Sequence, residues 1–119
     1  MNWTTPNRTG TGTADGELPP ALIFEVLAND RRRYVLHYLR QRVGSVSLGE
    51  LAEQLAIWED NPTTEHYERL LVDLYHSQLP KLADADLLQY DRDTEEVTRL
   101  EEADQLTPYL DLAMPADIQ

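Results

Sequence analysis

The sequence contains no cysteine, which excludes disulfides, thiolate metal sites and cysteine nucleophiles together. It also contains no apolar run that approaches the ~20 residues of a membrane-spanning helix, so no membrane partner is expected. Residues 1–17 are rich in Thr, Gly and Asn and lack the apolar core of a secretion signal. We therefore interpret them as a disordered tail, and we expect the protein to be cytoplasmic.

Lysine is scarce as well. Lys81 is the only lysine among ten basic residues, and these stand against 22 acidic residues for a net charge of −12. Carboxylates hold water and cations tightly, whereas the apolar stem of lysine promotes salting-out, so this balance favours solubility in concentrated salt. The composition is typical of a cytoplasmic protein of a halophilic archaeon. The alternative is a protein from ordinary salt whose negative charge binds a basic partner.

The charge is distributed unevenly along the chain. Residues 1–58 carry six acids and six bases, whereas residues 59–119 carry sixteen acids and only four bases. Phosphate binding requires cations gathered on one face. A surface that faces nucleic acid is therefore expected in the first half, or on a few isolated cations of the second half.

The length of 119 residues allows one domain with a modest core. Pro20, Asn29 and Ser47 are suited to helix starts, and Ser47 with Glu50 matches a capping box. Proline inside a helix lacks an N–H and clashes with the carbonyl four residues earlier, so Pro80 predicts a kink or restart near residues 76–80. Apolar spacing predicts helices over 21–28, 31–43, 48–57, 63–84 and 101–113.

A small β-hairpin is predicted after the long helix. Leu87–Tyr90 and Glu96–Leu100 are strand-like, and the polar residues 91–95 form its tip. A helix-turn-helix followed by a hairpin is the winged-helix plan. The predicted fold class is therefore α+β, a mostly helical winged helix-turn-helix with a two-stranded β-hairpin wing and a C-terminal helix. Its predicted parts are a tail (1–17), a winged-helix domain (18–100) and a C-terminal helix and tail (101–119).

Several segments resemble known winged-helix proteins. ArsR-type regulators have a similar arginine-rich helix start, positioning helix and recognition-helix end, which correspond here to Leu27–Leu36, Ser47–Leu55 and Gln78–Leu88. Leu74–Leu82, which contains the internal proline, together with Leu88–Asp91 is similar to the signature block of a haloarchaeal winged-helix domain family of uncharacterised function. The resemblance covers about residues 19–100.

This resemblance implies a transcriptional regulator that binds double-stranded DNA. The long helix would enter a major groove about 12 Å wide, and the hairpin would brace neighbouring phosphates. ArsR-type metal sensors supply cysteines, so metal sensing does not carry over. The alternative is a winged-helix domain that binds a protein partner and no DNA, which the acidic second half favours. The implied DNA-facing residues are His76, Ser77, Gln78, Lys81 and Arg92.

Other polar residues leave alternatives open. The arginines could contact phosphate, or they could pair with the acidic second half and cap the helix start; they are Arg31, Arg32, Arg33, Arg40 and Arg42. His37 is expected to face solvent. His37, His66 and His76 do not share ligand spacing, so no metal site is expected. No glycine-rich phosphate loop or nucleophile motif is present, so no enzyme activity, cofactor or small-molecule substrate is expected.

The last predicted helix, interrupted or restarted at Thr107-Pro108, carries more apolar residues than a solvated helix requires. Leu106, Tyr109 and Leu110 could form the seam of a homodimer, or they could cover the core of their own chain. Winged-helix proteins commonly read two half-sites as symmetric dimers. We therefore expect a homodimer.

Overall fold

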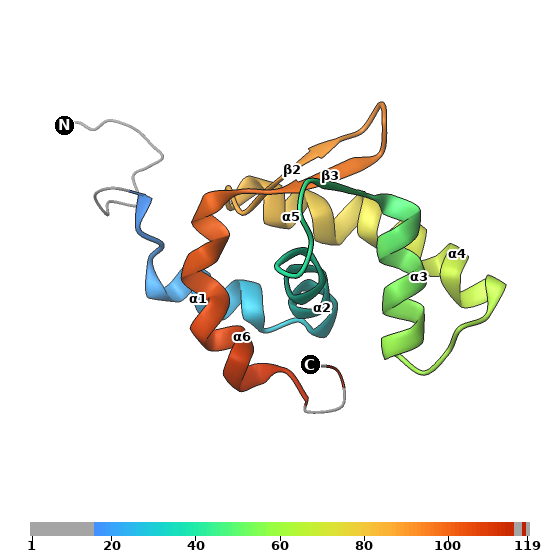
Figure 1. Cartoon of the computed structure of the whole chain (residues 1–119), viewed down its shortest axis with the longest axis horizontal. Coiled ribbons are helices and arrows are strands. Elements are labelled where there is room, and N and C mark those ends of the chain that lie inside the picture. The colour runs from blue at the N-terminus through green and yellow to red at the C-terminus, as the bar shows by residue number, and fades with distance from the viewer. Residues whose placement is uncertain (1–15, 116–117, 119) are drawn as a thin grey trace.

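The structure, a computed structural model, describes residues 16–115 and Ile118, so residues 1–15 of the tail predicted over residues 1–17 lie outside the described part. The fold is α+β. No helix within the described residues is long and apolar enough to cross a membrane. The elements in Figure 1 are, in chain order, α1 (Pro20–Leu27), α2 (Asp30–Leu39), β1 (Ser45–Ser47), α3 (Leu48–Trp58), α4 (Thr64–Asp73), the π-helical η3 (Leu74–Gln78), α5 (Leu79–Asp84), β2 (Leu88–Asp91), β3 (Glu96–Arg99), the 3-10 helix η4 (Glu101–Leu106) and α6 (Thr107–Ala113).

Helix α2 begins where predicted and ends earlier than predicted. The side-chain oxygen of Asn29 accepts hydrogen bonds from the backbone N–H groups of Arg31 (2.9 Å) and Arg32 (3.1 Å), which caps the helix. The helix stops at Leu39 rather than at the predicted end, Val43, whose side chain is fully exposed. Gly44 then turns the chain with a φ of 83°, a left-handed conformation that glycine adopts without strain.

The capping box predicted at the start of α3 is half formed. The Ser47 hydroxyl accepts a hydrogen bond from the backbone N–H of Glu50 at 3.0 Å, as predicted. The Glu50 carboxylate turns instead toward α2, where it accepts from Arg42 at 2.6 Å and from the Tyr38 hydroxyl. Hydrogen bonds from Arg42 and then Tyr38 lower the pKa of Glu50. The cap thereby also ties α3 to the end of α2.

The predicted hairpin is the larger part of a three-stranded antiparallel sheet in the order β1-β3-β2. The remaining strand of this sheet, β1, was not predicted, because only one of its three residues, Val46, is apolar. Val46 lies opposite Val97 of β3, and both are buried. The sheet therefore joins the hairpin to the segment between α2 and α3.

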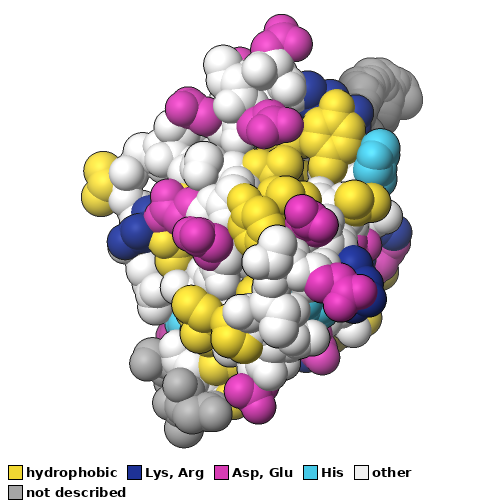
Figure 2. All heavy atoms as spheres, turned by 90° about the vertical axis from the view of Figure 1, so that its right-hand side faces the viewer, with side chains coloured by type: hydrophobic (Ala, Val, Ile, Leu, Met, Phe, Trp, Pro, Cys, Tyr) yellow, Lys and Arg dark blue, Asp and Glu magenta, His cyan; other side chains and the backbone are white. Residues whose placement is uncertain are grey.

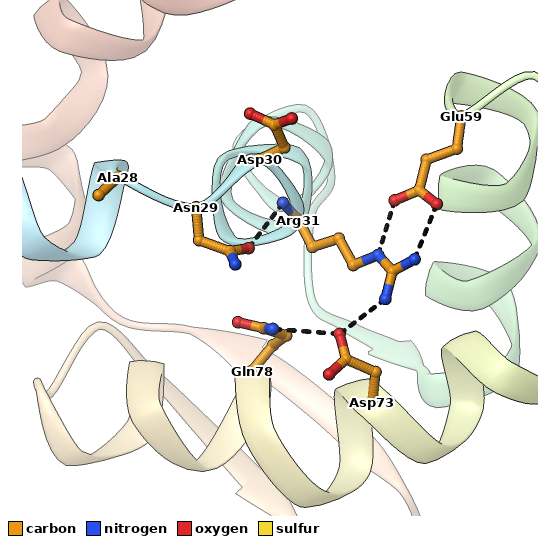
Figure 3. A pocket seen from close by; sticks show the side chains of 7 residues that line it. All are labelled: Ala28, Asn29, Asp30, Arg31, Glu59, Asp73 and Gln78. Atoms are coloured by element: carbon orange, nitrogen blue, oxygen red, sulfur yellow. Dashed lines mark hydrogen bonds and ion pairs between the residues drawn. The ribbon is translucent and has the colours of Figure 1, made fainter.

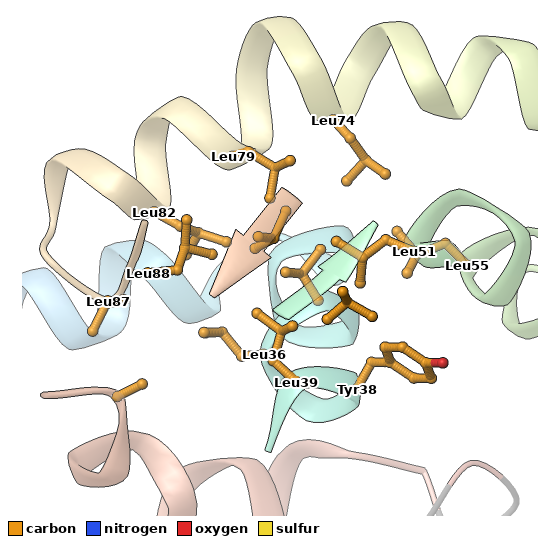
Figure 4. Packing of buried hydrophobic residues seen from close by; sticks show 14 of the residues in the cluster. Leu36, Tyr38, Leu39, Leu51, Leu55, Leu74, Leu79, Leu82, Leu87 and Leu88 are labelled. Carbon is orange, nitrogen blue, oxygen red and sulfur yellow. The ribbon is translucent and has the colours of Figure 1, made fainter. Parts of the chain in front are cut away.

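The core lies around α2, which appears nearly end-on at the centre of Figure 1. Residues 35–39 are all buried, so the end of this helix is enclosed on every side. In Figure 4, leucines of α3, η3, α5 and β2 converge on Leu36 and Leu39 of α2. Truncating one such leucine to alanine is expected to cost about 2–5 kcal/mol. This core fixes the position of the long helical segment relative to the sheet.

Candidate nucleic-acid interface

The long helical segment changes from α to π geometry over η3, directly before Pro80. The backbone N–H of Leu79 donates to the carbonyl of Leu74, five residues earlier. In a regular α-helix, residues five apart point about 140° apart, yet Leu74 and Leu79 are both fully buried. The wider turn lets both leucines enter the core, and it accommodates a proline that cannot donate to the helical ladder. The kink or restart predicted near residues 76–80 takes the form of this π turn, after which α5 begins at Leu79.

The residues around the π turn divide into an exposed set and a buried one. His76, Ser77 and Lys81 are exposed. Gln78 is only 7 % exposed. Its side-chain oxygen accepts from Arg32 at 3.1 Å, and its side-chain nitrogen donates to Asp73 at 3.1 Å. The structure therefore corrects the grouping of Gln78 with the exposed residues, because its carboxamide already joins α2 to the end of α4.

Lys81 makes a weak contact outside this helix. Its ammonium nitrogen lies 3.4 Å from the Glu25 carboxylate of α1, and the two side chains are 49 % and 60 % exposed. Exposed pairs of this kind contribute about 0–1 kcal/mol. The lysine therefore remains available to an anion that approaches from solvent.

The tip of the hairpin is shaped by its own acids. The Asp91 carboxylate accepts from the backbone N–H groups of Asp93 (2.9 Å) and Thr94 (3.3 Å), and Glu95 closes the turn with a φ of 60°. Arg92 is exposed, and within residues 16–115 it forms no ion pair. Its guanidinium carbon lies 4.9 Å from the centre of the Tyr75 ring.

Tyr75 is the residue of this surface that the sequence interpretation missed. Its ring centre lies 4.9 Å from that of His76 and 5.8 Å from that of Tyr90, both nearly edge to face. An aromatic residue beside an exposed histidine, with a tyrosine and an arginine on the following hairpin, is the signal that could have identified it. Together these residues link η3 to the hairpin. We call Tyr75, His76, Tyr90 and Arg92 the aromatic–arginine cluster.

Three arginines at the start of α2, and Arg40 at its end, bind other groups of the chain. Arg31 binds both oxygens of Glu59, at 2.7 Å and 3.0 Å, and also reaches Asp73 at 3.0 Å. Arg32 donates to the carbonyls of Val26 and Glu25 at the end of α1. Arg33 similarly binds Leu27 and Asp30, and Arg40 binds Asp111 at 2.7 Å. These arginines therefore pair with acids and cap helix ends within the chain, which is the structural alternative that the sequence left open.

A polar pocket lies around Arg31. Figure 3 shows its guanidinium between the carboxylates of Glu59 and Asp73, at the junction of α2, α3 and α4. His66 of α4 also lies 2.7 Å from Glu59. Burial alone would raise the pKa of Glu59, but the hydrogen bonds from Arg31 and His66 outweigh it, so this pKa is lowered. The hydrogen bond to Glu59 raises the pKa of Arg31. The two ion pairs of Arg31 join α2 to the ends of α3 and α4.

His37 is buried, at 1 % exposure, and the expectation that it faces solvent was wrong. Its ring lies 5.5 Å from that of Trp58, and its Nδ1 accepts from the Arg40 side chain at 3.1 Å. Burial first, and the positive charge of Arg40 second, lower the pKa of His37. His37 is buried although it is polar, because the end of α2 is enclosed by the core on every side.

The proposed dimer residues also separate. Leu106 is fully buried and Leu110 is 2 % exposed, so both cover the core of their own chain and offer no surface to a second copy. Tyr109 is 40 % exposed on α6, and the neighbouring Leu112 is 88 % exposed. The predicted break at Thr107 is confirmed as the change from η4 to α6. The large apolar side chains that α6 leaves exposed to a second copy are therefore those of Tyr109 and Leu112.

Acidic side chains are spread over the face in Figure 2, and basic side chains are few. Near the top of this face, basic, hydrophobic and histidine side chains lie next to one another. Residues 24–98 match a family model described as a domain of unknown function (DUF7344). The chain belongs to this family. The matched region begins within α1 and ends within β3, and it includes the whole aromatic–arginine cluster. Comparison with curated proteins and with solved structures gave no significant match.

Proposed function

We propose that the protein is a transcriptional regulator of the winged helix-turn-helix type that binds double-stranded DNA in a halophilic archaeon. The order of elements supports this proposal, because α3 is followed by the long α4–η3–α5 segment and then by the β2–β3 hairpin. The observation that carries it is the exposure of His76, Ser77 and Lys81 on this segment, together with the exposed Arg92 of the hairpin, which lies over Tyr75 next to His76. Donors on a helix and a cation beside it suit base edges and adjacent phosphates respectively.

Electrostatics make the expected binding dependent on the medium. Asp93 and Glu95 lie on the same hairpin tip as Arg92, and they would repel phosphate at ordinary ionic strength. In molar salt the Debye length is about 3 Å, so this repulsion is largely screened while short contacts remain. The acidic composition is suited to such a medium. A homodimer would place two such surfaces on half-sites about one helical turn apart.

A binding assay on genomic fragments in about 2–3 M KCl tests the proposal. Retention of fragments above a scrambled control is expected. Arg92→Glu and Lys81→Glu should weaken retention of all sequences alike, because phosphate contacts are not sequence-specific, whereas His76→Ala should also relax sequence preference. If no fragment is retained, the regulator function is wrong. Unchanged binding in all three variants would mean that another face contacts DNA.

The second candidate function is a protein-binding module without DNA binding. The observation that favours it is the outer stripe of α4, where Glu65, Glu68 and Val72 are exposed at helical spacing and Val72 is 60 % exposed. An acidic stripe with an apolar residue suits a basic amphipathic segment of a partner. A chain that retains no DNA fragment, but binds an arginine-rich helical peptide in a manner abolished by Glu68→Arg, would support this module instead.

A further inference from the structure

Arg92 is held by an aromatic ring although acids surround it in the sequence. Asp91, Asp93, Glu95 and Glu96 flank it on the hairpin, yet its guanidinium lies over Tyr75 of η3, 4.9 Å from the ring centre. Asp91 is occupied by the backbone N–H groups of the turn, and Glu96 accepts a hydrogen bond from Ser45 of β1 at 3.1 Å. Two of the four nearby acids therefore have other hydrogen-bond partners. The arginine side chain points across to the helix.

Tyr75 is itself fixed in position. Its ring packs edge to face on Tyr90 of β2 and on His76, and it lies half-buried against the core. Tyr90 is also packed against the core, and burial raises the pKa of its hydroxyl. The face of the Tyr75 ring carries the negative part of its quadrupole, which attracts a guanidinium. A fixed ring therefore limits the positions that the long, flexible arginine side chain adopts.

We propose that Tyr75 is a positioning residue that presents Arg92 to a DNA phosphate beside the groove contact of His76. This inference rests on the proposed function and deepens it. A cation already ordered on a ring loses less conformational entropy when it binds than one that moves freely on a hairpin tip. The stack also couples the hairpin to the helix, so that the two contacts form a single surface. Tyr75 acts through Arg92 and need not touch DNA itself.

The variants that test this proposal are Tyr75→Leu, Tyr75→Phe, Arg92→Gln and the double variant Tyr75→Leu/Arg92→Gln. The matched control is Tyr67→Leu, which removes another half-buried tyrosine, eight residues earlier on α4. DNA affinity is measured at several KCl concentrations, and thermal unfolding in the same buffers verifies that each variant folds. Proton NMR of the Arg92 side chain without DNA reports the ring-current shift from Tyr75.

Tyr75→Leu is expected to lower affinity about two- to fivefold, the scale of one exposed cation–π contact. Arg92→Gln should reduce the slope of log K against log [salt] by about 0.9, the loss of one phosphate contact. The double variant should bind no more weakly than Arg92→Gln alone. Tyr75→Phe keeps the aromatic ring, so this variant should retain both the wild-type affinity and the ring-current shift of Arg92. Tyr67→Leu should leave the salt slope and the Arg92 shift unchanged.

Three results would overturn the proposal. An unshifted Arg92 spectrum in the wild-type chain would mean that the stack is absent. Additive losses from Tyr75→Leu and Arg92→Gln would mean that the tyrosine acts independently of the arginine, and an effect of Tyr67→Leu equal to that of Tyr75→Leu would indicate a general structural role. In each case wild-type DNA binding remains and the regulator function stands. If the wild-type chain binds no DNA, the function fails and this inference fails with it.

Discussion

The molecule contains two regions with exposed or partly exposed cations, and it uses them differently. At the start of α2, Arg31 lies between Glu59 and Asp73, while Arg32 donates to backbone carbonyls of α1. At η3, α5 and the hairpin there are fewer cations, but Lys81 has only a weak partner and Arg92 has an aromatic one. The density of arginine along a sequence therefore does not locate a surface for nucleic acid. What matters is whether each cation already has a partner.

The largest expected effect tests whether the α2 arginines are structural. Arg31→Met leaves the carboxylates of Glu59 and Asp73 partly buried without their cation, and it should lower the free energy of unfolding by about 2 kcal/mol. Urea denaturation measures this change. The control is Arg69→Met, whose exposed pair with Glu65 should contribute about 0.5 kcal/mol or less. Equal losses in the two variants would contradict the internal role of Arg31.

The second effect concerns Arg92, the arginine whose guanidinium lies over an aromatic ring. Arg92→Glu should weaken DNA binding about tenfold, or about 1.4 kcal/mol, because a phosphate then meets a carboxylate in place of a cation. Arg42→Glu reverses the charge of another exposed arginine, at the end of α2, and should leave binding within twofold of the wild-type value. Fluorescence anisotropy with one labelled fragment measures both. A larger loss in Arg42→Glu would place DNA on the α2 side of the molecule.

A third effect concerns the pH dependence of the enclosed part of α2. The pKa of His37 is lowered from 6.5 in the folded chain, so the unfolded chain binds a proton more readily. Its contribution to stability is therefore complete above about pH 6.5 and is lost as pH falls toward the lower folded pKa. His37→Gln keeps an acceptor for Arg40 and should flatten this dependence. Urea unfolding at several pH values should show it, and an equal slope in both proteins would contradict the assignment.

The smallest effect separates Arg42 from the other arginines of the first half. The hydrogen bond from Arg42 lowers the pKa of Glu50, so Arg42→Gln should move that pKa back toward its usual value of 4.5. NMR titration of the Glu50 side chain measures this shift. Thermal unfolding at neutral pH should hardly change, because both side chains reach solvent. An unmoved Glu50 pKa would mean that the pair does not form in solution.

Local signals predicted much of the fold. The caps at Asn29 and Ser47 act within three residues of the helix starts, so they can be recognised without knowledge of the tertiary structure. Pro80 predicted a change in the helix for the same reason. The change is a π turn, which brings Leu74 and Leu79, five residues apart, into the core together. These features depend on neighbouring residues alone.

Features that depend on distant residues could not be predicted. His37 is buried because the end of α2 is enclosed on every side, and Gln78 is buried because Arg32 and Asp73 converge on it. The apolar face of the last segment was correctly recognised, but its pattern does not say whether a helix packs on its own chain or on another. Leu106 is fully buried, so this segment packs on the core of its own chain. Of the residues proposed to face DNA, four are exposed, and Gln78 is buried by tertiary packing that the sequence does not reveal.

An NMR titration of the protein with a retained DNA fragment shows directly which surface of the molecule binds DNA. Backbone amide shifts identify the residues that DNA approaches, without any substitution. The largest changes are expected at His76, Ser77 and Lys81 and at the hairpin around Arg92, with little change at the start of α2. Largest changes at residues 31–33, or on α6, would contradict it.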